Sequence, residues 1–215
     1  MNAQTNRATW LAVSAMFLLN GALYGIWAAR IPAMAGRHDL DAGELGLLLL
    51  LLAGGAIAAF PLAGRFADKL GAAFITLRIA VAYTVALALT ALAPNVATLA
   101  LALAVFGATH GAMDVAMNTW AGEAERHIAR PVMSSFHAIF SLGAGLGAAS
   151  GFFAEQWGVG IPMHFIVTGS AVAALTLAVA RIGWVSPTQD RVSGTPLFPL
   201  PKGPLVAVGL IAYCS

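Results

Sequence analysis

His110, Asp114 and His137 carry the side chains best suited to proton chemistry in a chain that is otherwise strongly apolar. On a helix His110 and Asp114 share one face, because they are four residues apart. A carboxylate within apolar sequence can exchange a proton or hold a substrate hydroxyl, and an imidazole can relay protons. Two structural alternatives stay open: Asp114 could pair with Arg78, and each histidine could hydrogen-bond a neighbouring helix.

The same three residues could instead hold a metal ion, since His and Asp at positions i and i+4 can chelate. The sequence contains no H-E-x-x-H pattern, and its lone cysteine, Cys214, rules out a thiolate cage or a disulfide within one chain. We therefore expect neither a metal nor another cofactor.

Amide and aromatic side chains gather on the helices that would carry this chemistry. Asn20, Tyr24 and Trp27 fall within about 60° of one another on a helix, and Asn118 shares a face with Asp114. Amides both donate and accept hydrogen bonds, which suits a small hydroxylated solute, and the rings could stack on it. Hydrogen bonding between helices is the alternative for the amides.

The composition places these residues in a membrane. Of the 215 residues 60% are hydrophobic and only 9% are charged, whereas a soluble domain has roughly 25% charged residues. A bilayer core needs roughly 20 residues of helix. Six segments meet this requirement, which predicts an all-α integral membrane bundle with spans at 9–29, 45–63, 73–93, 96–119, 134–153 and 161–184.

Charge predicts the orientation and the domain limits. With a cytoplasmic N-terminus, eight basic residues lie inside and two outside, which follows the positive-inside rule. This bias explains the net charge of +2 without a nucleic-acid partner. We expect a six-helix unit at 1–184, a cytoplasmic linker at 185–203 and the start of a seventh helix at 204–215, which is too short to span.

Two further features interrupt or notch the spans. The polar phrase from Gly64 to Gly71 separates the second and third spans, and the segment from Gly122 to Pro131 reads as a solvated cytoplasmic loop. Gly143, Gly147 and Gly151 form a repeated G-x-x-x-G, which allows close helix packing or sliding.

Two motifs resemble a known family. Gly64-x-x-x-Asp68-Lys69-x-Gly71 resembles the loop signature of the major facilitator superfamily, although Ala72 and Ala73 stand where two basic residues are usual. The segments His110–Asn118 and Met133–Ala138 are similar to a bacterial branch of that superfamily akin to the fucose–proton symporters.

The resemblance implies one half of a twelve-helix transporter, made of two inverted three-helix repeats, in a bacterial inner membrane. It implies that the first and fourth helices line the cavity and that the third and sixth face outward. A proton-coupled carrier of a small, sugar-like solute is then expected, completed by a C-terminal six-helix half. The residues expected to bind substrate are Asn20, Tyr24, Trp27, His110, Asn118 and His137. Proton coupling is expected at Asp114, and a gating loop at Gly64, Asp68, Lys69 and Gly71.

Two other classes of protein remain as alternatives. One is an intramembrane metal-dependent enzyme that uses His110, Asp114 and His137. The other is a membrane subunit or fragment that does not itself transport.

Overall fold

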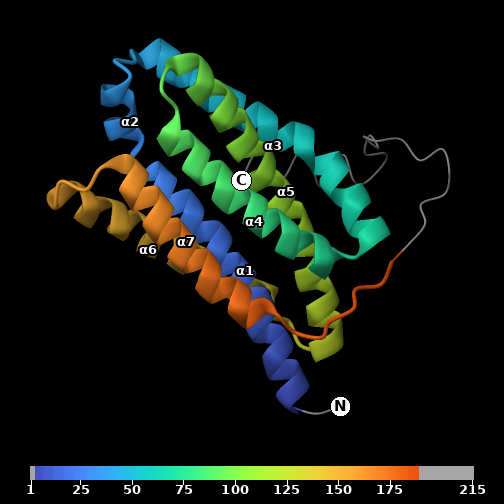
Figure 1. Ribbon diagram of the computed structural model, residues 1–215. Helices are drawn as coiled ribbons and strands as arrows, with labels where there is room; N and C mark the ends of the chain where they lie inside the picture. The colour runs from blue at the N-terminus through green and yellow to red at the C-terminus, as the bar shows by residue number, and fades with distance from the viewer. Residues whose placement is uncertain (1–2, 189–215) are drawn as a thin grey trace.

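The computed structural model describes residues 3–188, which form seven α-helices (Figure 1). Six of them are long and apolar enough to cross a membrane, as the sequence predicts. The start of a seventh spanning helix, expected at 204–215, and most of the expected linker lie outside the described residues. The helices are α1 (Ala3–Ala28), α2 (Ile31–Arg37), α3 (Ala42–Leu70), α4 (Ala72–Leu92), α5 (Val96–Ile128), α6 (Met133–Gln156) and α7 (Ile161–Ala180).

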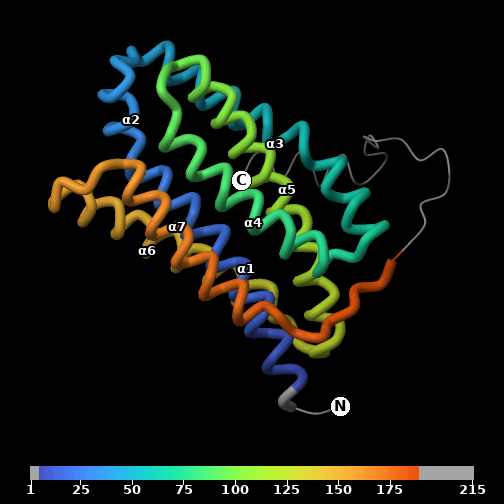
Figure 2. The backbone as a smooth tube through the Cα atoms, viewed as in Figure 1, coloured from blue at the N-terminus to red at the C-terminus, as the bar shows by residue number. Residues whose placement is uncertain are grey.

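The six long helices form two equivalent groups of three: α1, α3 and α4, followed by α5, α6 and α7. The helix α1 packs along α6 as α5 packs along α3, and α7 contacts α1 as α4 contacts α5. Figure 2 shows the green α4 and the orange α7 side by side, with α1 running behind α7. Because each group crosses the membrane three times, equivalent helices run in opposite directions. The contacts are therefore those of two inverted three-helix repeats.

Glycines set the closest of these contacts. A Cβ atom at Gly147 of α6 would overlap the carbonyl oxygen of Ala22 on α1, and one at Gly107 of α5 would overlap that of Leu52 on α3. Only glycine permits such an approach of two backbones. The G-x-x-x-G repeat of α6 is thus part of a close helix contact, and α5 makes the equivalent contact with α3.

Two helices, α3 and α5, extend furthest beyond their predicted C-terminal ends. The helix α3 runs to Leu70 rather than to residue 63, so the polar phrase is helical and the turn is confined to Gly71, which has a φ of +91°. The helix α5 runs to Ile128, so most of the expected loop after Gly122 is helix. Neither stretch contains a proline, and both are rich in residues such as Ala, Leu, Arg, Lys and Glu, which are good helix formers.

The structure differs from the predicted spans in two other places, at α2 and at the end of α7. The segment after Arg30 was expected to be a plain connection, but it folds into the short helix α2, with Pro32 in its first turn. The helix α7 ends at Ala180, so residues 181–184 of the sixth predicted span are not helical.

Side chains define where α3, α5 and α6 begin. Asp41 and Glu44 form a capping box at the start of α3, and Asn95 forms one with Thr98 at the start of α5. The carboxylate of Glu125 accepts hydrogen bonds of 2.8 Å from the backbone N–H groups of Val132 and Met133, which lie at the start of α6. A negative group is favoured at a helix N-terminus.

Candidate functional site

A hydrogen-bonded cluster joins α1, α4 and α5. The Nδ1 atom of His110 lies 3.1 Å from Oδ1 of Asn20 and 3.1 Å from the hydroxyl oxygen of Tyr83. Asn20 and Tyr83 are fully buried, and His110 is partly buried. Two of the spans that contact α5, namely α1 and α4, thus join α5 in one polar centre, and all three helices touch one another.

The partners of His110 define where its proton lies. The Oδ1 atom of Asn20 can only accept, so the nitrogen facing it carries the hydrogen. The amide nitrogen of Asn20 points instead to the sulfur of Met117, at 3.6 Å. With Nδ1 protonated, the Nε2 atom of the neutral ring keeps a free lone pair. His110 therefore presents a proton acceptor on the side away from Asn20.

Aromatic rings enclose this polar centre. The ring of Tyr24 stacks on His110 with centroids 5.0 Å apart, and Trp27 lies 5.5 Å from Tyr24 and 5.6 Å from Phe106. Among the described residues, the buried Nε1 atom of Trp27 has no hydrogen-bond partner. Such an unpaired donor is costly unless a ligand or water satisfies it. Asn20, Tyr24, Trp27 and His110, four of the predicted site residues, thus form one contiguous group.

Asp114 and Asn118 form a separate pair one turn further along α5. The amide nitrogen of Asn118 donates to the backbone oxygen of Asp114 at 2.8 Å and to its carboxylate at 3.2 Å. Asp114 is exposed on the face of the six helices. Within residues 3–188 it forms no ion pair with Arg78, whose guanidinium lies over the ring of Phe74. The alternative of an Asp114–Arg78 pair was therefore wrong.

His137 lies apart from the other two ionisable residues. It is exposed on α6, and its ring meets Phe17 of α1 edge-on, with centroids 5.3 Å apart. No hydrogen bond links His137 to His110 or Asp114 among the described side chains. Within residues 3–188, no three His, Cys, Asp or Glu side chains lie close enough together to hold a metal ion.

The expected gating residues occupy the end of α3 and the turn that follows it. Gly64, Asp68 and Lys69 are helical, with Lys69 exposed and Asp68 partly buried. At Gly71 the positive φ disfavours any other residue, and a Cβ there would lie 3.1 Å from the Cβ of Ser186. This end of the bundle is therefore packed against the segment that follows α7.

Glu123 anchors that segment, although the sequence suggested a solvated residue without a role. Its buried carboxylate accepts hydrogen bonds from the hydroxyl of Ser186 at 2.6 Å and from the indole of Trp184 at 3.2 Å. Ser186 in turn accepts from the backbone N–H of Ala73 at 2.9 Å. One carboxylate thus ties α5 to the start of α4 and to the chain after α7.

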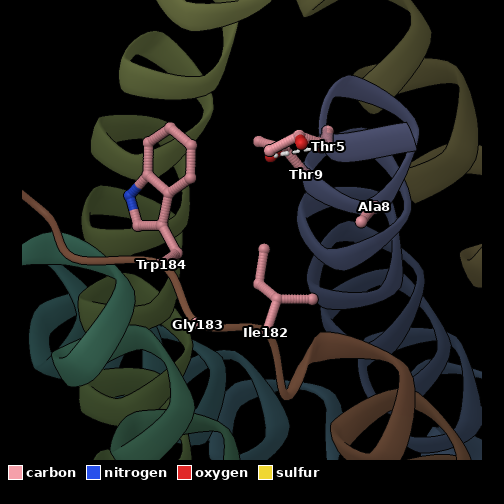
Figure 3. A pocket seen from close by; sticks show the side chains of 6 residues that line it. All are labelled: Thr5, Ala8, Thr9, Ile182, Gly183 and Trp184. Atoms are coloured by element: carbon pink, nitrogen blue, oxygen red, sulfur yellow. Dashed lines mark hydrogen bonds between the residues drawn. The ribbon is translucent and has the colours of Figure 1, made fainter. Parts of the chain in front are cut away.

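A cavity of about 410 Å³ lies beside this anchor, between the start of α1 and the chain after α7 (Figure 3). In Figure 3 the hydroxyl of Thr9 turns back to the backbone of its own helix, to which it donates at Thr5, at 3.0 Å. None of the residues that line this cavity is charged. The cavity therefore has fewer groups for binding a polar solute or exchanging a proton than the cluster around His110. Its lining residues are Thr5, Ala8, Thr9, Ile182, Gly183 and Trp184.

Tyr83 is the member of the cluster that the sequence did not single out. It is the lone tyrosine of an apolar span, and its ring also stacks on Phe106 at 4.9 Å. A buried tyrosine needs a hydrogen-bond partner, and this requirement was the available signal. Which helix supplies that partner depends on the tertiary packing.

Similarity to known proteins agrees with this architecture. The sequence profile of the Major Facilitator Superfamily matches residues 9–212. The transporter y4wD of Sinorhizobium fredii is 45% identical over 206 residues, which cover 96% of this chain and 55% of the relative. An MFS-type transporter of Yersinia pestis is 33% identical over 198 residues, covering 92% of this chain and 51% of the relative.

A third relative is the membrane protein MosC of Rhizobium meliloti, which is 32% identical over 181 residues, or 84% of this chain and 42% of the relative. The chain belongs to the Major Facilitator Superfamily, and it is a multi-pass membrane protein. It spans about half the length of the curated relatives that it matches.

Proposed function

We propose that this chain is one half of a secondary transporter that moves a small solute across a bacterial inner membrane by alternating access. The observation that carries the proposal is the position of Asp114: a carboxylate on a membrane-spanning helix, exposed on the bundle surface and one turn from His110. A carboxylate directed at lipid would be costly, so this face is better explained by an aqueous pathway.

In this mechanism Asp114 carries the coupled proton. Protonation removes the charge and with it the cost of enclosing the carboxylate when the pathway closes. Asn118 holds the carboxylate in place through the bond from its amide. Release of the proton on the cytoplasmic side, where we place the N-terminus, returns the carrier to its starting state.

The cluster beside Asp114 supplies the groups that would bind the solute. The stacked rings of Tyr24 and His110 offer an aromatic surface, and the indole N–H of Trp27 offers a donor that has no partner within residues 3–188. We also assign substrate binding to Asn118, which lies one turn beyond Asp114, and to His137 on α6, which lies apart from the cluster. Rings and neutral hydrogen-bonding groups of this kind suit a sugar-like, hydroxylated solute.

We assign a gating role to the end of α3 and the turn that follows it, at Gly64, Asp68, Lys69 and Gly71. They lie at the same end of the bundle as Glu123 and the chain after α7, where a movement between two halves would be transmitted. The intramembrane enzyme has less support, because His137 lies apart from His110 and Asp114. A subunit that does not transport would not require an exposed carboxylate in a span.

The test is solute-driven proton flux in proteoliposomes that contain the full-length protein. A pH-sensitive dye is trapped inside, and a panel of monosaccharides is added outside. We expect one or more of the sugars to acidify or alkalinise the lumen with the wild-type protein. Asp114→Asn should abolish the proton flux. Asp41→Asn is the control, since Asp41 is a helix-capping carboxylate outside the site.

Two results would contradict the proposal. If Asp114→Asn moved protons with solute as the wild type does, Asp114 would not be the coupling group. If no solute in a broadened panel moved with or without protons, the protein would not be a carrier of this class.

A further inference from the structure

A groove of about 270 Å³ lies between α4 and α7 and is independent of the site described above. Figure 1 shows these two helices running side by side, and they contact each other directly. Two arginines and four apolar side chains line the groove, and no acidic residue is among them. The lining residues are Phe74, Leu77, Arg78, Val81, Leu177 and Arg181.

The two arginines are held apart from any carboxylate. Arg78 and Arg181 are both exposed, and within residues 3–188 neither forms an ion pair. The guanidinium of Arg78 lies over the ring of Phe74, 5.0 Å from its centroid, in a cation–π contact with another residue that lines the groove. Two guanidinium groups in one groove without a counter-charge create a site for an anion, and their planar donors match phosphate oxygens.

The groove lies toward the end of the bundle at which α4 begins and α7 ends. Arg181 directly follows the last residue of α7, and Arg78 is six residues into α4, about 9 Å from its start. Beyond the groove, the exposed large side chains of both helices are apolar, as at Val85 and Leu175. The surface therefore changes from apolar to basic toward this end of the two helices, and the long side chain of Arg78 can extend from within the span toward the lipid phosphates.

We propose that Arg78 and Arg181 bind the phosphate of an anionic phospholipid, whose acyl chains lie along the apolar wall at Val81 and Leu177. The leaflet is the one at the N-terminal end of α1. A soluble phosphate would gain nothing from the apolar wall, whereas a lipid is already positioned beside it. Charge complementarity and depth together favour the lipid as the occupant.

The test is native mass spectrometry of the purified full-length protein, titrated separately with dioleoylphosphatidylglycerol and dioleoylphosphatidylcholine. The two lipids have the same acyl chains, so a difference in affinity reports the headgroup charge. We expect the wild type to prefer the glycerol lipid. Each arginine near a charged membrane surface contributes enough for about a fivefold change in affinity, so R78Q/R181Q should bind that lipid roughly 25-fold more weakly.

Two further variants keep the test specific. R130Q removes an exposed arginine outside the groove and should bind both lipids as the wild type does. V81W keeps both charges but fills the apolar wall, and it should also weaken binding of the glycerol lipid. A melting curve for each variant shows whether it is folded, and the wild-type comparison of the two lipids needs no variant.

Three results would overturn the proposal. The first is equal binding of the two lipids by the wild type. The second is binding of the glycerol lipid by folded R78Q/R181Q at the level of R130Q. The third is displacement of the bound lipid by millimolar inorganic phosphate, which would make the groove a site for soluble anions.

Discussion

Tyr24 and His110 lie ring against ring between α1 and α5, with centroids 5.0 Å apart and planes 22° from parallel. The contact joins the two equivalent helices of the inverted repeats. Asn20 and Tyr83 fix the imidazole from its Nδ1 side. The stack therefore joins α1 to α5, and the bonds at Nδ1 leave Nε2 of His110 outside this network.

Tyr83→Phe tests this network. The change removes one hydrogen-bond partner of His110 and keeps the ring that stacks on Phe106. We expect the free energy of unfolding to fall by about 1 kcal/mol. Thermal melting in detergent measures the change. Thr119→Val is the control, because within residues 3–188 the hydroxyl of Thr119 bonds to its own helix, and it should melt near the wild type. Equal melting of both variants would show that the bond to His110 contributes nothing.

Gly147→Ala tests the close contact between α6 and α1. The added methyl group would overlap the carbonyl oxygen of Ala22, so the helices must move apart, at a cost of about 1–3 kcal/mol. Gly145→Ala on the same helix meets nothing within 4 Å and should be neutral or stabilising. The yield of monodisperse protein and its melting temperature measure the difference. Equal behaviour of the two variants would contradict the packing.

The sequence alone could predict the six spans and the shared face of Asn20, Tyr24 and Trp27, since both follow from helix geometry and the thickness of the bilayer. It could not predict Tyr83 as a partner of His110, because neighbours across helices depend on how the bundle packs. The predicted ends of the helices were wrong for another reason. Hydropathy marks where lipid contact stops, whereas α3 continues to Leu70 and α5 to Ile128 in polar sequence.

The buried position of Glu123 also could not be predicted from the sequence. Glu125 and Arg126 follow it closely, and such a run of charge is typical of a solvated loop, yet the carboxylate of Glu123 is buried against Ser186 and Trp184. The donors come from a segment about 60 residues further along the chain. No local pattern specifies that contact.

Ser186→Ala tests the anchor formed by Glu123. The hydroxyl of Ser186 accepts the hydrogen bond from the N–H of Ala73, so its loss exposes that amide. We expect hydrogen exchange at Ala73 to become roughly 5- to 10-fold faster, as for the loss of one hydrogen bond of about 1 kcal/mol. Thr188→Ala, an exposed neighbour, should leave the exchange unchanged. Unchanged exchange in Ser186→Ala would contradict the anchor.

His38 gives the connection between α2 and α3 a dependence on pH. Burial lowers the pKa of His38 below its ordinary value of 6.5, the charge of Arg37 lowers it further, and Asp39 partly offsets both. Because the pKa is lower in the folded state, the folded connection favours the neutral ring. Its stability is therefore full well above pH 6.5 and falls as the pH drops through 6.5 towards the folded-state pKa.

The amide of Leu40, which bonds to the carbonyl oxygen of Ala35 at 3.0 Å, reports this effect. Its protection factor should decrease on acidification in the wild type, and His38→Gln should remove most of that decrease. A larger protection factor at low pH in the wild type would show that the sign is wrong.

The central claim is that the face carrying Asp114 borders water, and thiol labelling tests it most directly. In a Cys214→Ser background, Asn118→Cys and Ser141→Cys place thiols near Asp114 and on the exposed face of α6, and Leu175→Cys places one on the apolar face of α7. A charged, membrane-impermeant thiol reagent reacts with thiolates in water. We predict labelling of the first two in membranes, from one side or the other, and none of Leu175→Cys. Failure of both Asn118→Cys and Ser141→Cys to react from either side would contradict the account.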